Sequence, residues 1–300
     1  MQTLYTLATT GTTSLDEQKK LGISLLDDKI SRFLDLFVIA VLYTAKVAQY
    51  AEKDAGKRAS KYLPTADDLN VNTKIAGNEF LWKILDNETF IEKIKDKNIS
   101  RYLDDELVKK IYKKFAETDE YKTYISSRER DPKSELGIIR FLWEDKIYGD
   151  ESVMEYFTDD LPEWEDDIDM IKILMDNFFK SNSKVNFLKL ITAEKNEYAR
   201  ELLNTTIDKE QFCTELIQPK LINWDAERVA LIDMLLLRMG VAELLYFPTI
   251  PTKVTINEYI ELAKLYSTPQ SGQFVNGVLD NILKDLTRGN KIHKEQRNTK

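Results

Sequence analysis

The chain has 300 residues, of which 43% are hydrophobic and 31% charged, and its net charge is −8. This length allows one large domain or two smaller ones, and the composition predicts a helix-rich globular protein and excludes disorder throughout. Cys213 is the only cysteine and His293 the only histidine, which excludes a disulfide framework, a Cys/His zinc site and a Ser-His-Asp triad within one chain.

No pattern for a cofactor or a membrane segment is present. The phosphate-binding patterns GxxxxGK[ST] and GxGxxG are absent, and acidic residues on helix faces are far more often solvated than catalytic. We therefore expect no enzyme activity, no cofactor and no metal. The longest apolar run, Leu36 to Tyr43, is shorter than the roughly 18 residues that span a bilayer. The N-terminus also lacks the basic region of a signal peptide, so we expect a cytoplasmic protein.

Helical spacing of apolar residues begins at Met1 and is interrupted after Ala8. Ser14 and Glu17 then form a capping-box pattern, which begins a long apolar face and predicts a helix that reaches toward Ala55. Pro64 and a group of turn-forming residues end this helix. The first 60 residues therefore predict a short helix followed by a very long one.

The middle of the chain predicts further helices. Residues 78–128 contain short, lysine-rich amphipathic segments, and apolar stripes follow at 139–143 and 171–178. The acidic stretch 151–169 favours the N-terminal end of the helix that it precedes, through the helix dipole. No segment has the alternating pattern of a strand, so the fold class that we predict is all-α.

The last third predicts three helices. Residues 224–246 are apolar on most sides, as expected for a central core helix. Thr255 is the expected N-cap of the next helix, which continues to Tyr266. In the last helix, apolar residues recur at i, i+3, i+4, i+7 and i+11 from Val275 to Leu286 and define a buried stripe.

Phe274, Asn276 and Gly277 lie outside this stripe. At about 100° per residue, Phe274 falls on its flank and Gly277 nearly behind it. By position alone Phe274 is thus not needed for the core. In one interpretation it stacks on a base or fills a partner's pocket, and Gly277 lets another backbone approach. The alternative is that Phe274 covers a neighbouring helix and Gly277 only relieves crowding.

The C-terminal residues 288–300 are basic. They carry Arg288, Lys291, Lys294, Arg297 and Lys300 against the single acid Glu295. A flexible basic tail is one interpretation, and an RNA contact is the other.

The segment "IPTKVTINEYIELAK", followed by "FVNGVLD", resembles the C-terminal signature of the NusB family of bacterial transcription antitermination factors. "ERVALIDMLLLRMGVAELLYF" resembles the preceding helix of that family, so the resemblance covers roughly residues 218–287. "MQTLYTL" resembles the first helix of the family. Residues 60–210 do not match and indicate a long helical insertion, as in a long form of the Bacteroidetes type.

The resemblance implies an all-α fold of two packed small bundles with this insertion. It implies a factor that binds the boxA element of ribosomal RNA transcripts together with NusE, a protein of the small ribosomal subunit, and acts with other Nus factors on RNA polymerase. By matching position, the expected RNA contacts are Gln2, Tyr5, Gln273 and Phe274. The expected NusE contacts are Asp233, Gln270 and Phe274, although Gln270 departs from the acidic residue common at that position.

The domain boundaries that we expect are 1–216 for an N-terminal bundle that includes the insertion at about 60–210, then 217–287 for the C-terminal bundle and 288–300 for the flexible tail. Family members carry an arginine-rich stretch before the first helix, where this sequence starts at Met1. This difference suggests that the natural chain starts upstream.

Two further interpretations remain. The chain could be an interaction scaffold of the same fold that has lost boxA binding, which its negative charge permits. An RNA methyltransferase with a NusB-like domain would need an added nucleotide-binding α/β domain, for which the sequence has no strand-glycine-helix unit.

Overall fold

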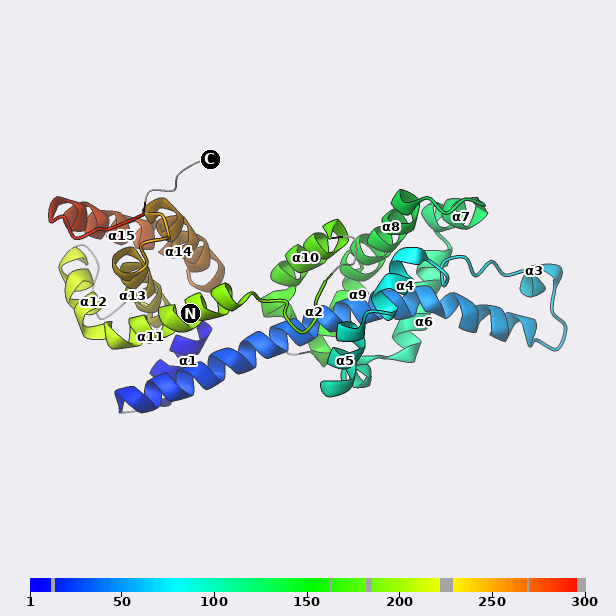
Figure 1. The fold of residues 1–300 in the computed structure, drawn as a ribbon, viewed down its shortest axis with the longest axis horizontal. Coiled ribbons are helices and arrows are strands. Elements are labelled where there is room, and N and C mark those ends of the chain that lie inside the picture. The colour runs from blue at the N-terminus through cyan, green and yellow to red at the C-terminus, as the bar shows by residue number, and fades with distance from the viewer. Residues whose placement is uncertain (12–13, 162, 182–184, 222–228, 269, 296–300) are drawn as a thin grey trace. The chain divides into compact units, whose positions relative to one another are not determined.

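The computed structural model describes residues 1–11, 14–161, 163–181, 185–221, 229–268 and 270–295 (Figure 1). All regular elements within these ranges are helices, which confirms the predicted all-α class. They are α1 (Gln2–Thr10), α2 (Leu15–Ala59), α3 (Ala66–Leu69), α4 (Glu79–Leu85), α5 (Glu88–Asp96), η1 (Ile99–Tyr102), α6 (Asp105–Ala116), α7 (Asp119–Ser126), α8 (Pro132–Phe141), η2 (Leu142–Tyr148), α9 (Glu151–Asp160), α10 (Trp164–Lys180), α11 (Ala193–Asp208), α12 (Glu210–Ile217), η3 (Gln218–Lys220), α13 (Leu231–Tyr246), α14 (Thr252–Tyr266) and α15 (Ser271–Arg288).

The chain forms two compact units. Unit 1 contains residues Met1–Lys29 and Ile191–Lys300, and unit 2 contains Ile30–Leu190. This division differs from the expected boundaries, because the N-terminal residues pack with the C-terminal helices and not with the inserted segment. The sequence pattern of α2 is continuous through residue 29 and gives no sign that the helix belongs to two cores.

Helix α2 is 45 residues long and begins as its capping pattern predicts. The backbone N–H of Glu17 donates to Ser14 Oγ at 3.3 Å, and two acidic side chains lie in the first turn, where the helix dipole favours negative charge. The middle of the helix, from Leu36 to Ala51, is almost continuously buried. No helix in the described ranges is both long enough and apolar enough to cross a membrane.

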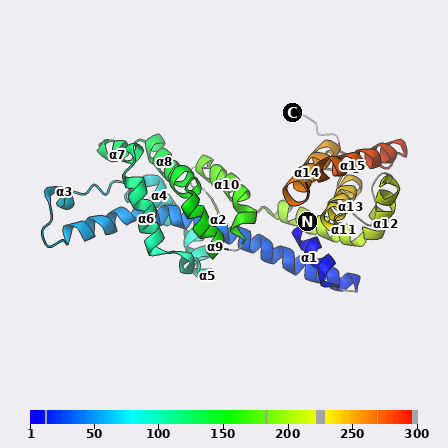
Figure 2. The same ribbon diagram turned by 180° about the vertical axis from the view of Figure 1, so that it is seen from behind.

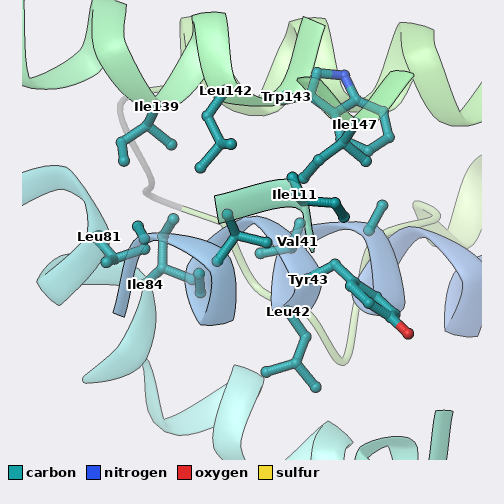
Figure 3. Packing of buried hydrophobic residues seen from close by; sticks show 14 of the residues in the cluster. Val41, Leu42, Tyr43, Leu81, Ile84, Ile111, Ile139, Leu142, Trp143 and Ile147 are labelled. Atoms are coloured by element: carbon teal, nitrogen blue, oxygen red, sulfur yellow. The ribbon is translucent and has the colours of Figure 1, made fainter. Parts of the chain in front are cut away.

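The core of unit 2 is built around the second part of α2. Figure 3 shows Val41, Leu42 and Tyr43 of α2 surrounded by side chains of α4, α6, α8 and η2. The fully buried side chains facing α2 include Leu81, Ile84, Ile111, Leu142 and Trp143. The amphipathic segments between residues 78 and 128 therefore bury their apolar faces on α2 and leave most of their lysines exposed, while Lys93 pairs with Asp35 of α2 at 2.7 Å.

The core of unit 1 is built around α13, as the apolar sequence of this helix predicts. Helices α11, α12, α14 and α15 surround it in both views (Figures 1 and 2), and α1 also packs against it. Gly240 permits this close packing, because a Cβ atom there would lie 3.0 Å from the Leu279 side chain of α15. Unit 1 thus has its own hydrophobic cluster, separate from that of unit 2.

The starts of α13 and α14 differ from those predicted or lie outside the described residues. The expected start at residues 224–228 lies outside the described residues, and the described helix α13 starts at Leu231. The prediction that Thr255 caps α14 is wrong, because α14 starts at Thr252 after Pro251 and Thr255 is fully buried within it. Proline is favourable just before a helix, since its missing N–H would be unpaired in the first turn.

Candidate functional site

Helix α1 presents Gln2 and Tyr5 on the surface of unit 1. Leu4 and Leu7 of the same helix are buried in the hydrophobic cluster with α13, which fixes the opposite face outward. As a result Tyr5 is 42% exposed and Gln2 is half-buried. The exposed phenol ring of Tyr5 is available for stacking on a flat ligand group.

A cation lies beside Gln2. Lys29, an exposed residue of α2, donates from Nζ to Gln2 Oε1 at 3.4 Å. Sequence reasoning missed Lys29 because 27 positions separate it from Gln2, and no local pattern relates the two. The exposed face of α1 therefore combines an aromatic ring, an amide and an ammonium group, all of which suit single-stranded RNA.

The N-terminus of α15 carries Gln270 and Gln273, both exposed. Gln270 is the N-cap residue, and the first turn closes through the N–H groups of Gln273 and Phe274, which donate to Gln270 O at 3.1 Å. Gly272 is buried against α14, where a Cβ atom would lie 3.0 Å from Lys264 Cγ. Glycine at this position thus permits the close approach of α14 that orients the two glutamines.

Phe274 lies in the core, as the second interpretation of its sequence position predicts, and not on the outer surface. Its side chain is only 5% exposed and belongs to the hydrophobic cluster of unit 1. The physical reason is that α15 packs on both α13 and α14, so that its buried arc is wider than one stripe. Asn276 and Gly277 do lie outward, and a Cβ atom at Gly277 would meet no heavy atom within 4 Å.

Asp233 is also buried, with 6% of its surface exposed. Its Oδ2 atom accepts a hydrogen bond from Ser271 Oγ at 2.8 Å, and its Oδ1 atom has no hydrogen-bond partner within the described part of the chain. The carboxylate therefore joins the start of α13 to the start of α15. This placement gives Asp233 a structural task next to Gln270, one that the sequence did not predict.

Part of the basic C-terminal segment is bound to the core. Lys294 Nζ donates to the backbone oxygens of Glu243 at 3.0 Å and Phe247 at 2.7 Å, at the end of α13, where each oxygen also accepts a backbone N–H. Burial lowers the pKa of Lys294 below its usual value. The Glu243 carboxylate accepts hydrogen bonds from the hydroxyl groups of Tyr198 and Tyr259. Within the described residues 291–295, the amine of Lys294 thus binds the backbone of unit 1 itself.

The exposed groups of this surface are suited to binding and include no reactive constellation. Among the described residues, no group of three or more His, Cys, Asp or Glu side chains could hold a metal ion. The two tyrosines whose hydroxyls approach Glu243 have raised pKa values, mainly because burial disfavours the phenolate. They are therefore neutral hydrogen-bond donors in the core.

Comparison with known proteins gives the family of this chain. The family model described as "NusB family" matches residues 169–284, which include α13, α14 and most of α15. The transcription antitermination protein NusB of Listeria monocytogenes serotype 4a is 38% identical over 89 residues, which are 30% of this chain and 70% of that protein. The chain belongs to the NusB family.

Other NusB proteins align over similar lengths. The protein of Salinibacter ruber is 45% identical over 34% of this chain, and that of Chloroherpeton thalassium is 39% identical over the same share. The chain spans 63% and 48%, respectively, of the lengths of these two relatives. No solved structure shows significant similarity to the chain. The NusB family match begins at residue 169, within the expected insertion, and includes the end of unit 2.

Proposed function

We propose that this chain acts in transcription antitermination by binding the boxA element of ribosomal RNA transcripts together with NusE. The relatives named above are transcription antitermination proteins, and the family match covers the helices that carry Asp233, Gln270, Gln273 and Phe274. In this role the chain works in the cytoplasm, joins other Nus factors and RNA polymerase through the RNA and NusE, and needs no catalytic group.

The observation that carries the proposal is that unit 1 exposes two groups of side chains suited to binding, on helices that both pack on α13. Tyr5 lies on α1 and Lys29 on α2, while Gln270 and Gln273 lie at the start of α15. Both α1 and α15 pack on α13. We assign base stacking to Tyr5, a phosphate contact to Lys29, a base-edge contact to Gln273 and a NusE contact to Gln270. Gln2 orients Lys29 through their hydrogen bond.

Phe274 and Asp233 have positioning roles in this proposal. Phe274 holds the first turn of α15 on the core, and Asp233 holds Ser271. Both act on RNA and NusE through the placement of Gln270 and Gln273. This differs from the direct contacts that the resemblance implied for the two residues.

The test is a titration of the full chain, with and without NusE of the same organism, against fluorescent boxA RNA and a scrambled RNA at two salt concentrations. Selective binding that tightens with NusE and weakens with salt supports the proposal, since phosphate contacts release counterions. If the chain binds NusE but does not select boxA over the scrambled RNA, the RNA part of the proposal is contradicted. The chain would then act as an interaction scaffold.

Matched variants test the assigned residues. Tyr5→Ala is expected to weaken boxA binding about 5- to 150-fold, as stacking on one base is worth roughly 1–3 kcal/mol. The control is Tyr246→Ala, since Tyr246 of α13 is 41% exposed against 42% for Tyr5. Equal losses in the two variants would contradict a specific contact by Tyr5.

Lys29→Ala is expected to reduce the salt dependence of log K by about 0.7, the loss of one phosphate contact to a single strand. Lys83→Ala, a change of an exposed lysine in unit 2, is the control and should leave the slope unchanged. A slope that is the same in both variants and in the unmodified chain would exclude Lys29 from the RNA contact.

A further inference from the structure

Helix α2 carries a glycine at the place where it packs against α1 and α11 in unit 1. Gly22 is buried, and a Cβ atom there would lie 3.0 Å from Leu7 Cδ1 of α1 and 3.3 Å from Leu203 Cδ2 of α11. Figures 1 and 2 show α1 beside the first turns of α2. Glycine inside a helix is destabilising relative to alanine, so the close approach of these helices is what Gly22 provides.

A second glycine of the same helix has no such neighbours. Gly56 is exposed, and a Cβ atom there would meet no heavy atom of the described residues within 4 Å. The same residue type in the same helix therefore has two different surroundings. Only at Gly22 does the missing side chain set the distance between helices, and Gly56 is a matched comparison for it.

The contact between Gln2 and Lys29 lies at the same pair of helices. Lys29 follows Gly22 by about two turns and lies on the same face of α2, since residues at i and i+7 share a helix face. The two helices run antiparallel here, because Leu7 of α1 lies at Gly22 and the earlier Gln2 accepts from Lys29 Nζ at 3.4 Å. This distance is near the upper limit of a hydrogen bond, so a wider separation of α1 and α2 breaks it.

Two ion pairs fasten α2 to α11 on either side of Gly22. Lys19 Nζ lies 2.5 Å from Asp208 Oδ1, and Arg200 Nη2 donates to both carboxylate oxygens of Asp27 at 2.6 Å. These side chains are partly exposed, and such pairs hold a helix only weakly. The ion pairs therefore orient α2 on α11, whereas its separation from α1 is set at Gly22.

We propose that Gly22 is a positioning residue for RNA binding: its missing side chain lets α1 and α2 approach closely enough for Gln2 to hold Lys29 where it contacts phosphate. The proposal rests on the boxA function proposed above and adds a buried residue that touches no RNA itself. Helix α1 is also held on α13, so a larger residue at position 22 displaces Lys29 and leaves base stacking by Tyr5 in place.

The test is the salt dependence of boxA RNA binding by the full chain with NusE, measured for the unmodified chain, Gly22→Leu and Gly56→Leu. Gly22→Leu is expected to reduce the slope of log K by about 0.7, the loss of one phosphate contact to a single strand, and to keep the preference for boxA over scrambled RNA. Gly56→Leu inserts the same side chain into the same helix and should leave the slope unchanged. Circular dichroism and thermal unfolding verify that the variants are folded. Gly22→Ala replaces Gly22→Leu if the leucine variant does not fold, with a change in the same direction.

A double substitution separates a positioning role from a general loss of stability. Gly22→Leu is combined with Lys29→Ala, and the slope is expected to equal that of Lys29→Ala alone, because both changes remove the same contact. An effect of Gly22→Leu that did not pass through Lys29 would add to the loss. A further reduction of the slope in the double variant would therefore overturn the proposal.

A measurement without RNA separates this proposal from the proposed function. The acylation rate of Lys29 Nζ by an N-hydroxysuccinimide ester, followed by mass spectrometry, reports whether Gln2 holds the amine. The rate is expected to rise in Gly22→Leu and to stay unchanged in Gly56→Leu. An unchanged rate in Gly22→Leu would overturn the positioning role whether or not the chain binds RNA.

The RNA titration distinguishes the remaining outcomes. If the unmodified chain selects boxA and Gly22→Leu leaves the salt slope unchanged, only the role of Gly22 is overturned. If the unmodified chain does not select boxA, the proposed function is overturned, and the role of Gly22 in RNA binding is overturned with it.

Discussion

At the scale of single residues, Phe274 decides between two interpretations of α15. The ring lies in the hydrophobic cluster of unit 1, in the first turn of a helix whose neighbouring Gln270 and Gln273 are exposed. Phe274→Ala is expected to lower the free energy of unfolding by about 3–5 kcal/mol, the usual cost of deleting a buried phenyl ring. Denaturant unfolding followed by circular dichroism measures this loss. An unchanged stability together with weaker RNA binding would instead assign the ring to direct contact.

A conservative substitution tests whether Asp233 contacts NusE directly or only holds Ser271 at the start of α15. Asp233→Asn removes the negative charge but keeps an oxygen that can accept from Ser271 Oγ. We expect NusE affinity to stay within about threefold, whereas Asp233→Ala should cost about 1–3 kcal/mol of stability because Ser271 loses its buried acceptor. Calorimetric titration and thermal unfolding provide the two readouts. A tenfold or greater loss of NusE affinity in the asparagine variant would instead indicate that the charge of Asp233 contacts NusE directly.

At the scale of elements, the end of α13 depends on a residue far away in sequence. A basic side chain near a helix C-terminus can donate to the last carbonyls, and Lys294 supplies a second donor to two of them, Glu243 O and Phe247 O. Because the amine is partly buried, these contacts should be stronger than a solvent-exposed pair. The described part of the basic segment is therefore partly structural.

Lys294→Met is expected to reduce stability by about 1–2 kcal/mol, since a charged donor to two carbonyls is lost while the apolar stem is kept. Lys291→Met is the control, because Lys291 is an exposed neighbour whose change should stay within about 0.5 kcal/mol. Urea unfolding measures both. Equal stability of the two variants, with equally reduced RNA affinity, would favour the tail as an RNA contact.

At the scale of the whole molecule, the two separate hydrophobic clusters predict that a destabilising substitution in the core of one unit does not destabilise the other unit. Trp143 is fully buried in unit 2, and Trp143→Ala is expected to destabilise that unit by about 3–5 kcal/mol. Hydrogen exchange should then rise within residues 30–190 and stay unchanged in α13, α14 and α15. Trp82→Ala, at an exposed tryptophan of α4, is the control. Equal increases in both units would mean that the chain unfolds as one cooperative body.

The sequence predicted the helices better than it predicted the exposure of single residues. The long helix after Ser14, the apolar helix α13 and the stripe of α15 follow from helical periodicity and capping, which are local properties. The flank position of Phe274 was also computed from periodicity, but it depends on how many neighbours cover α15. The expected tail at 288–300 had no local sign that Lys294 reaches the end of α13.

The sequence by itself determined the all-α class, most helix positions and the resemblance to the NusB family, because these depend on local spacing and on residue identity. Only the tertiary structure decided that the first 29 residues pack with the C-terminal helices, that Asp233 meets Ser271, and that Lys29 lies beside Gln2. The reason is physical. Contacts between residues far apart in the chain are selected by the packing of whole helices, and no local pattern records which helices become neighbours.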